Sequence, residues 1–280
     1  MKPIRRLAFA VNHDKMGANG VAAELAAIAR GDGVEVVQMD SHDLPVGSLA
    51  GFDACCVVGG DGTLLSASHE AALQGVPVIG VNRGSLGFLT TYSVDEARAS
   101  FKSLLAGEYQ LSQRELLGCR IGANQEDFAV NDVVIKDEGH SKLVRLAVYA
   151  DEEFVTEYYC DGLIFSTPTG STAYTMSAGG PIIHPSAAVV AMTPICPHTL
   201  TNRTVIFRKD VQLRVESRIE GASILIALDG QRNLLTTTGE LVEISISKRT
   251  LALVQKPGYE HFEVVRKKLS WSGDAASGAK

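Results

Sequence analysis

The 280-residue sequence contains no apolar run long enough to span a bilayer, no CxxC cysteine pair and no excess of positive charge. Two arginines precede a short apolar stretch near the start, but polar and acidic residues follow at once, which predicts a first β-strand rather than a signal peptide. The formal net charge of −6 disfavours nonspecific nucleic-acid binding, because such binding needs a concentrated positive field. We therefore expect a cytoplasmic protein without a membrane or nucleic-acid partner.

Cysteine and histidine show no pattern typical of a metal site. The five cysteines are odd in number, and we expect buried, reduced thiols, which suit a reducing compartment; they are Cys55, Cys56, Cys119, Cys160 and Cys196. The seven histidines are scattered without metal-ligand spacing, so a structural zinc site is not expected. Apolar residues make up 45% of the chain, enough to bury a substantial core.

The hydrophobic periodicity divides the chain into two parts. Up to about Gly107, strand-like and helix-like segments alternate, which predicts a parallel sheet with right-handed crossovers. Strand-like segments separated by turns then follow one another and predict a β-rich, antiparallel part; they include DFAVNDVVI, ELVEISIS and TLALVQ. The closing segment YEHFEVVRKKLSW predicts a helix, and the small, polar end predicts disorder. The expected organisation is an α/β domain at 1–107, a β-rich domain at 108–256, a C-terminal helix at 257–271 and a disordered tail at 272–280.

A glycine-rich turn is the sharpest chemical feature. Gly59-Gly60-Asp61-Gly62-Thr63 follows a continuously apolar segment and precedes a helix-like one. Ligands bind at the carboxyl ends of strands in open α/β sheets, and glycines leave backbone N–H groups free to approach phosphate oxygens. A carboxylate would repel phosphates, so Asp61 suits accepting a proton from an attacking hydroxyl or helping to hold a metal ion. The alternative is an ordinary turn in which Gly and Asp serve geometry and helix capping.

A second feature is the block DGLIFSTPTGSTAYTMSAGGPII, which runs from Asp161 to Ile183. Small residues let a ligand approach the backbone, and Tyr174 could pack its ring on an adenine. The alternative is a turn followed by a small-residue helix packed tightly against the sheet. The neutral hydrogen-bonding side chains of this block are Ser166, Thr167, Thr169, Ser171, Thr172 and Ser177.

Three further groups of polar residues are candidates. Asn131 and Asp132 interrupt the strand-like FAVNDVVI, and a bulge or strand end that presents them to a ribose would explain the pair. An edge strand with a solvated face explains it equally well. Arg83 follows a strand end and is a weaker candidate for phosphate, since surface arginines are common. His198 lies in a proline-punctuated loop, where fixing the loop is the better interpretation than catalysis.

Together these blocks resemble the NAD kinase family. GGDGT, NRGSLGFL, the Asn-acidic pair, the long hydroxyl-rich block and PHTLTNR stand in the family's order, and the resemblance covers about Ile4 to Trp271. The resemblance implies the two-domain architecture of that family, with the active site between the domains and the C-terminal tail returning to the first. It implies transfer of a phosphoryl group from ATP, with a divalent metal such as Mg or Mn, to the adenosine-ribose 2′-hydroxyl of NAD. It also implies a homodimer or homotetramer.

The resemblance also assigns roles to positions of this sequence. It makes Asp61 the proton acceptor for the ribose hydroxyl. For the phosphates, the residues themselves point to the glycine-rich turn, with Gly59, Gly60, Gly62 and Thr63, and to Arg83. The implied NAD-binding residues are Asp61, Gly62, Asn131, Asp132, Lys142, Asp161, Thr172, Ala173, Tyr174, Ser177 and Gln231. Two positions depart from the usual pattern. Thr204 stands where proline is common, and Tyr159 replaces a basic residue found in some relatives, which leaves open whether NADH is accepted.

Two other classes of function compete with this interpretation. A lipid or sugar-phosphate kinase explains Gly59–Thr63 equally well, but not the hydroxyl-rich block. A noncatalytic NAD sensor would keep the nucleoside-binding blocks but has no need of Asp61, so the intact turn favours an enzyme. The sequence has no Ser-His-Asp array and no P-loop lysine motif, which agrees with a transfer that needs positioning, charge neutralisation and a base.

Overall fold

The computed structural model of the chain describes residues 1–84, 87–139, 142–219, 221, 223–237 and 239–271. It divides into two compact units, Met1–Gln113 with Leu251–Lys280 and Arg114–Thr250. The chain passes from one unit to the other within β6 (Gln110–Ile121) and β17 (Val242–Gln255). The predicted boundaries, after residues 107 and 256, stand just outside these two strands. The tail predicted to be disordered, 272–280, lies outside the described residues.

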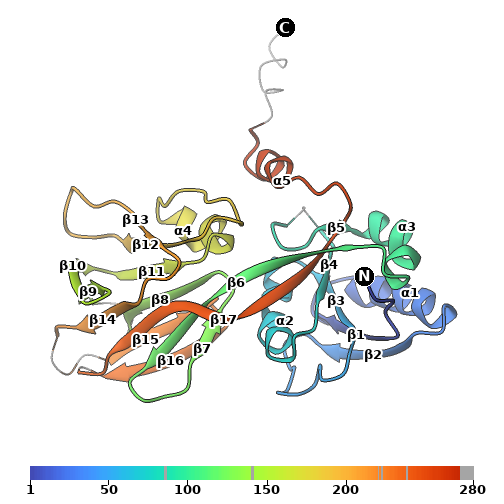
Figure 1. Cartoon of the computed structure of the whole chain (residues 1–280), viewed down its shortest axis with the longest axis horizontal. Helices are drawn as coiled ribbons and strands as arrows, with labels where there is room; N and C mark the ends of the chain where they lie inside the picture. Colours follow the sequence, from blue (N-terminus) through green and yellow to red (C-terminus); the bar gives the residue numbers. More distant parts are fainter. Residues whose placement is uncertain (85–86, 140–141, 220, 222, 238, 272–280) are drawn as a thin grey trace, which may run out of the picture. The chain divides into compact units, whose positions relative to one another are not determined.

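The first unit is built on the parallel sheet that the alternating pattern predicts. The strand order is β17-β4-β3-β1-β2, and each neighbouring pair is parallel. The elements of this unit are β1 (Arg6–Val11), α1 (Ala18–Gly31), β2 (Glu35–Asp40), β3 (Ala54–Gly59), α2 (Asp61–Gln74), β4 (Val78–Asn82), β5 (Tyr92–Ser93), α3 (Val94–Leu105) and α5 (His261–Lys268) (Figure 1).

Helices cover both faces of this sheet. α1 and α3 pack together on the face that carries Phe9, Cys56 and Ile79. α2 packs against β3 and β4, whose side chains alternate between the two faces. All six residues of β3 are therefore buried, as its continuous apolar pattern predicts.

Local signals set the helix ends. α3 begins with a capping box, in which the Ser93 hydroxyl accepts the Glu96 N–H and the Glu96 carboxylate accepts the Ser93 N–H. Gly75 caps the C-terminal end of α2, and its φ of 66° is a left-handed conformation that glycine adopts without strain. α2 begins at Asp61, so the last part of the glycine-rich turn is already helical.

The second unit is a pair of antiparallel sheets around one core, as the change of periodicity predicts. One sheet has the order β13-β12-β11-β8-β15-β16, and the other contains β10-β9-β14-β17 with β6 and β7. The core joins Leu117, Leu146 and Leu213 of one sheet to Ile135 and Phe165 of the other. The remaining elements are β7 (Asp127–Ala129), β8 (Asp132–Asp137), β9 (Val144–Ala150), β10 (Glu153–Cys160), β11 (Gly162–Ser166), the 3₁₀-helix η1 (Thr169–Thr172), α4 (Tyr174–Ser177), β12 (Val189–Ile195), β13 (Val205–Arg208), β14 (Leu213–Ser217), β15 (Ser223–Leu228) and β16 (Arg232–Thr237).

The strand predictions need three corrections. The predicted strands ELVEISIS and TLALVQ form the single strand β17, because the polar residues between them face the surface without breaking the strand. The strand predicted at DFAVNDVVI is instead two strands, β7 and β8, separated at Val130 and Asn131. The strand predictions did not include β12 and β16, since a proline near the end of β12 and the polar ends of β16 obscure the strand pattern.

The cysteines agree with the prediction at four positions and differ at one. All five are free, and Cys55, Cys56, Cys119 and Cys160 are buried. Burial raises the pKa of the Cys55 thiol to about 12, so this group stays protonated and unreactive at neutral pH. The prediction is wrong for Cys196, which is exposed in the turn that follows β12.

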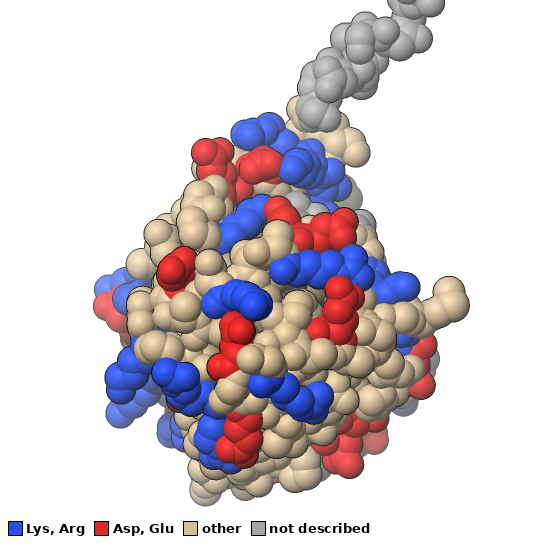
Figure 2. Space-filling model, turned by 90° about the vertical axis from the view of Figure 1, so that its right-hand side faces the viewer, with Lys and Arg blue, Asp and Glu red and all other residues tan. Residues whose placement is uncertain are grey.

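Charged side chains of both signs are interspersed on the face of the molecule drawn in Figure 2. Several pair with each other in the first unit, including Arg98 with Glu24 at 2.8 Å and Arg6 with Glu35 at 3.0 Å. Such exposed pairs contribute about 0–1 kcal/mol each. No helix among the described residues combines the length and the apolar character that crossing a membrane requires.

Candidate active site

The glycine-rich turn lies at the carboxyl end of β3, in the middle of the parallel sheet. Gly59 is the last residue of the strand, and its carbonyl accepts the N–H of Arg83, which follows the neighbouring strand β4, at 2.9 Å. Gly60 is the extended N-cap residue, and Asp61–Thr63 form the first turn of α2. The first N–H groups of a helix have no partner within the helix, so this turn presents donors suited to phosphate oxygens.

The Asp61 carboxylate does not cap its own helix but binds the segment that follows β4. Its Oδ2 accepts the N–H of Phe88 at 2.8 Å. Its Oδ1 accepts the N–H of Leu89 at 3.2 Å and both the N–H and the hydroxyl of Thr90, at 3.1 and 3.0 Å. Gly87 is required here, because a Cβ at that position would overlap the Asp61 carboxylate.

This arrangement leaves acceptor capacity on one oxygen of Asp61. A carboxylate offers about four lone-pair sites over its two oxygens. Oδ1 is engaged by three donors, whereas Oδ2 accepts the Phe88 N–H. Oδ2 is thus the atom able to accept a further proton or to ligate a cation. The alternative of a purely structural Asp61 also has a basis, since the same side chain holds the turn to residues 88–90.

Two cations stand beside the turn. The Lys15 Nζ lies 3.1 Å from where a Cβ on Gly60 would stand, so the side chain reaches over the turn from the loop after β1. The Arg83 guanidinium lies against Gly17, and a Cβ there would overlap it. Gly17 has a φ of 77° and precedes α1. These loops follow three neighbouring parallel strands, so their positive groups gather at one edge of the sheet.

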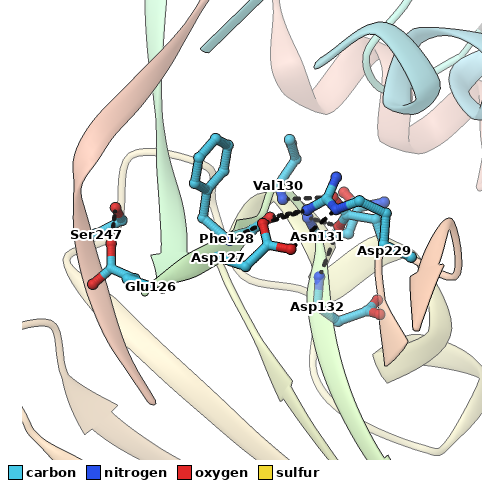
Figure 3. A network of polar contacts seen from close by, with 9 residues as sticks. Glu126, Asp127, Phe128, Val130, Asn131, Asp132, Asp229 and Ser247 are labelled. Atoms are coloured by element: carbon cyan, nitrogen blue, oxygen red, sulfur yellow. Dashed lines mark hydrogen bonds and ion pairs between the residues drawn. The ribbon is translucent and has the colours of Figure 1, made fainter. Parts of the chain in front are cut away.

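In the second unit, the chain bends at Val130–Asp132, between β7 and β8. Figure 3 shows the Asp229 carboxylate facing the backbone of this corner. Its Oδ2 accepts the N–H of Val130 at 2.8 Å, and its Oδ1 accepts the N–H groups of Asn131 and Asp132 at 2.6 and 3.2 Å. The N–H of Asp229 in turn donates to the carbonyl of Asp132 at 2.9 Å. One side chain therefore holds three consecutive amides.

The carbonyl groups of the same corner are held by the hydroxyl-rich block. The Thr167 hydroxyl donates to the carbonyl of Val130 at 2.6 Å, and the Thr167 N–H donates to the carbonyl of Asn131 at 2.9 Å. Gly170 lies so close that a Cβ would overlap the backbone of Asn131. The structure thus brings together two of the sequence motifs, the Asn-Asp pair and the hydroxyl-rich block.

The side chains of the Asn-Asp pair are buried, at 9% exposure for Asn131 and 5% for Asp132. β8 lies between β11 and β15, so the alternative of a solvated edge strand is wrong, and Asp132 stands at the beginning of a central strand. Burial and the nearby Asp229 carboxylate raise the pKa of Asp132 to about 7. Burial also raises the pKa of Asp229, while its three amide donors and Arg232 oppose that rise.

The other predicted NAD-binding residues lie on several loops of the second unit. Thr172 ends η1, Tyr174 and Ser177 belong to α4, and Ala173 lies between the two helices. The Tyr174 side chain is 47% exposed and has no role in the core. Gln231 follows Asp229 and Gly230 in the turn between β15 and β16, two residues after the carboxylate that binds the corner.

Lys142 and Asp161 belong to other loops than the corner. Lys142 is exposed just before β9, and Asp161 is exposed between β10 and β11, where its N–H donates to the carbonyl of Ile195. The His198 N–H donates to the carbonyl of Tyr159, and the two rings meet edge to face at 5.3 Å. This contact agrees with a His198 that fixes its loop.

Two residues of these sites escaped the sequence interpretation. Asp229 stands in ALDGQ, where an Asp-Gly pair after a strand predicts an ordinary turn. The nearby Gln231, itself a predicted NAD-binding residue, was the available signal in the sequence. Lys15 lies in the loop after the first strand and belongs to no motif. Only the position of this loop, at the carboxyl end of a parallel strand, indicates that Lys15 could lie near the site.

The residues that the structure describes include no group of three or more His, Cys, Asp or Glu side chains arranged to hold a metal ion. A cation carried by nucleotide phosphates needs only one or two protein carboxylates. The Asp61 Oδ2 atom meets that requirement, so the donor set fits a cation that is bound mainly by phosphates.

A donor-rich turn at strand ends, a carboxylate within it and a hydroxyl-rich loop define a nucleotide-dependent phosphotransferase. Two family models match the chain, the ATP-NAD kinase N-terminal domain at residues 42–109 and the ATP-NAD kinase C-terminal domain at residues 130–256. An NAD kinase of Syntrophotalea carbinolica is 39% identical over 90% of this chain and 93% of its own length. An NAD kinase of Geobacter sulfurreducens is 37% identical over 94% of this chain and 97% of its own length. The chain therefore belongs to the ATP-NAD kinase family.

Solved structures agree with this assignment at the level of the fold. A yeast NADH kinase in complex with NADH has a TM-score of 0.85 at 22% identity and covers 98% of this chain and 89% of its own. An NAD kinase from Archaeoglobus fulgidus in complex with ATP has a TM-score of 0.76 at 26% identity, over 94% and 99%. The predicted fold class, family and enzyme class are confirmed, and none of these relatives favours a lipid kinase, a sugar-phosphate kinase or a sensor.

Proposed function

We propose that this protein is an NAD kinase that transfers the terminal phosphoryl group of ATP to the adenosine-ribose 2′-hydroxyl of NAD and so produces NADP. The observation that carries the proposal is the corner at Val130–Asp132, where two buried polar side chains stand on a backbone held by hydrogen bonds. A ribose presents adjacent hydroxyl groups, and paired polar side chains on a rigid backbone suit their recognition.

The phosphate-binding part of the site lies in the first unit. The residues proposed for it are Gly59, Gly60, Gly62, Thr63 and Arg83. The turn offers N–H groups at the start of α2, and Arg83 and Lys15 offer positive charge. Phosphoryl transfer requires mainly positioning and charge neutralisation, and this set of donors supplies both.

Asp61 is the proposed proton acceptor. Its Oδ2 atom has the free lone pair that a ribose hydroxyl or a cation would use, while the donors from residues 88–90 hold the carboxylate in place. A divalent metal, Mg or Mn, would neutralise the charge on the donor phosphates. The protein's own contribution is then to orient the acceptor hydroxyl and to accept its proton.

The NAD-binding part of the site uses the second unit. Asn131 and Asp132 are proposed for the ribose, and Tyr174, which is about half exposed, for packing on the adenine ring. The remaining residues proposed for NAD are Asp61, Gly62, Lys142, Asp161, Thr172, Ala173, Ser177 and Gln231. The stretch 166–180 contains no Lys or Arg, which suits an unphosphorylated sugar as the acceptor.

A comparison of acceptors tests this proposal. Purified protein with ATP and magnesium should phosphorylate NAD far faster than diacylglycerol, sphingosine or fructose 6-phosphate. Phosphorylation of a lipid or sugar phosphate without phosphorylation of NAD would contradict it. Binding of NAD without any turnover would instead support a sensor.

The proposal extends to assembly and location. β13 and β16 end one sheet of the described second unit, and exposed apolar side chains lie on both, Ile206 and Leu235. Open strand edges need a cover, and a second copy of the chain is the cover we propose, in a homodimer or homotetramer. The free cysteines, four of them buried, suit the reducing cytoplasm.

A further inference from the structure

The half-buried side chain of Asp229 binds a distant segment of the chain as well as lying in the turn between β15 and β16. Asp229 has a left-handed backbone with a φ of 54°, a conformation that costs about 1 kcal/mol for a residue with a side chain but that Asp tolerates. From this position its carboxylate reaches Val130, Asn131 and Asp132, which lie 97 to 99 residues earlier in the chain. Closing a turn between β15 and β16 requires none of these three bonds.

The chemistry of the contact requires a carboxylate. Three N–H groups converge on two acceptor atoms, and an amide side chain such as Asn supplies only one oxygen for them. Charge-assisted hydrogen bonds of this kind are about twice as strong as neutral ones. A second acid beside the buried Asp132 is unfavourable, because each negative charge opposes the other. An acid at position 229 is therefore poorly explained by stability alone, but it is well suited to fixing the corner.

We propose that Asp229 is a positioning residue for the acceptor substrate: it fixes the backbone of the corner so that the Asn131 and Asp132 side chains are set for the ribose of NAD. This inference rests on the proposed function. Asp229 does not need to touch the substrate, because its effect passes through the three amides. Catalytic and binding groups work best when held within about 0.5 Å of their productive position, so losing this support affects affinity for NAD in particular.

The charges around Asp132 give a second consequence. The groups that face it are Asp229 and, through Asp229, the Arg232 guanidinium, which itself binds Asp127 at 3.0 Å. An ionised Asp132 accepts hydrogen bonds from ribose hydroxyls, so kcat/KM for NAD should rise with pH as Asp132 loses its proton near pH 7. Removing the negative charge of Asp229 lets Asp132 ionise more easily, which shifts this rise to lower pH.

The test uses Asp229→Asn, which keeps the shape and tolerates the left-handed backbone. KM for NAD should rise by about tenfold or more, the value of one or two hydrogen bonds, while KM for ATP stays within about twofold. The midpoint of the pH profile should move to lower pH. Asp229→Gly is the second variant, since it removes the carboxylate and also the backbone strain, and it should raise KM for NAD at least as much.

Asp151→Asn is the matched control. Asp151 lies in the same unit, also has a positive φ, 46°, and also accepts a backbone N–H, that of Gln212 at 2.9 Å. It should lower the melting temperature without changing KM for NAD. If Asp229→Asn and Asp229→Gly only lower the melting temperature as the control does, with KM for NAD and the pH midpoint unchanged, the positioning role is wrong.

Calorimetric titration with NAD separates this inference from the proposed function. Weaker NAD binding by both Asp229 variants supports the positioning role even if the wild-type protein shows no turnover, a result that would overturn only the kinase proposal. Equal NAD binding by the wild-type protein and both variants overturns the positioning role alone. A wild-type protein that neither binds nor phosphorylates NAD overturns both.

Discussion

The backbone N–H of Phe88 donates to the Asp61 Oδ2 atom at 2.8 Å, and this bond ties the glycine-rich turn after β3 to the segment after β4. Asp61 therefore has two tasks. It holds residues 88–90 through donors that mostly converge on Oδ1, and it keeps a lone pair on Oδ2 for a substrate hydroxyl or a cation.

The first prediction concerns the rate of transfer. Asp61→Asn should lower kcat by about 10²–10⁴-fold, because the amide cannot accept the proton of the 2′-hydroxyl. KM for NAD should change much less. Steady-state kinetics over a range of NAD concentrations measure both. Near-normal turnover would remove Asp61 from the role of base, and a loss of NAD affinity alone would make it a binding residue.

A matched variant shows whether Asp61 acts as a proton acceptor or only holds residues 88–90 through its hydrogen bonds. Thr90→Val removes the hydroxyl that Asp61 Oδ1 accepts but leaves the carboxylate and the Thr90 N–H. The fully buried Thr90 also binds Asn82, so the free energy of unfolding should fall by about 1–3 kcal/mol. Turnover should stay close to that of the wild-type protein. If Thr90→Val loses as much rate as Asp61→Asn, the contribution of Asp61 is structural.

Much of the fold follows from the sequence because its signals are local. The continuous apolar segment at 54–58 predicts a strand buried on both faces, and the helix start at Ser93 and Glu96 depends on two residues only three positions apart. Contacts between segments that are far apart in the sequence cannot be predicted in this way. The bonds from Asp229 to Val130–Asp132 join residues nearly a hundred positions apart, and no local pattern marks them. The sequence thus indicates candidate residues for the site but not the contacts that hold them in place.

The second prediction concerns stability and pH. Burial and Asp229 raise the pKa of Asp132 to about 7 from an ordinary value of 3.8, so between these pH values the folded state binds more protons than the unfolded state. The contribution of Asp132 to stability is therefore fully present at low pH and is lost as pH rises toward 7. Asp132→Asn removes this dependence. The melting temperature of this variant, relative to that of the wild-type protein, should be higher at pH 8 than at pH 5.

Equal pH dependence of the two melting temperatures would contradict a raised pKa at Asp132. A second variant at the same position tests binding. Asp132→Ala should weaken the use of NAD by about 1–3 kcal/mol, the value of one or two hydrogen bonds. The ratio of kcat/KM for NAD between the wild-type and variant proteins measures this loss.

The third prediction concerns the close approach of the hydroxyl-rich block to the corner. Gly170→Ala would place a methyl group on the backbone of Asn131, which cannot move without disturbing the Asp229 bonds. The free energy of unfolding should fall by about 1–3 kcal/mol, and KM for NAD should rise. Gly20→Ala is the control, because a Cβ at Gly20 meets nothing within 4 Å in the first turn of α1, and it should leave the protein as stable or stabilise it by up to about 1 kcal/mol. Equal melting temperatures for both variants would contradict the contact.

The fourth prediction concerns assembly. Light scattering at micromolar concentration should give a mass above that of one 29.8 kDa chain. Ile206→Lys on β13 and Leu235→Lys on β16 place a charge on the two open edges of the second unit, and at least one of them should dissociate the oligomer. A monomeric wild-type protein would contradict the proposal, as would two variants of unchanged mass.

The central claim is phosphorylation of NAD at one hydroxyl, and the product tests it most directly. Purified protein, ATP and magnesium are incubated with NAD, and the product is offered to a dehydrogenase that accepts only NADP. We expect NADP to accumulate with time and with enzyme concentration, and to be strongly reduced with the Asp61→Asn variant. Consumption of ATP without a product that this dehydrogenase accepts, or no reaction of NAD at all, would contradict the claim.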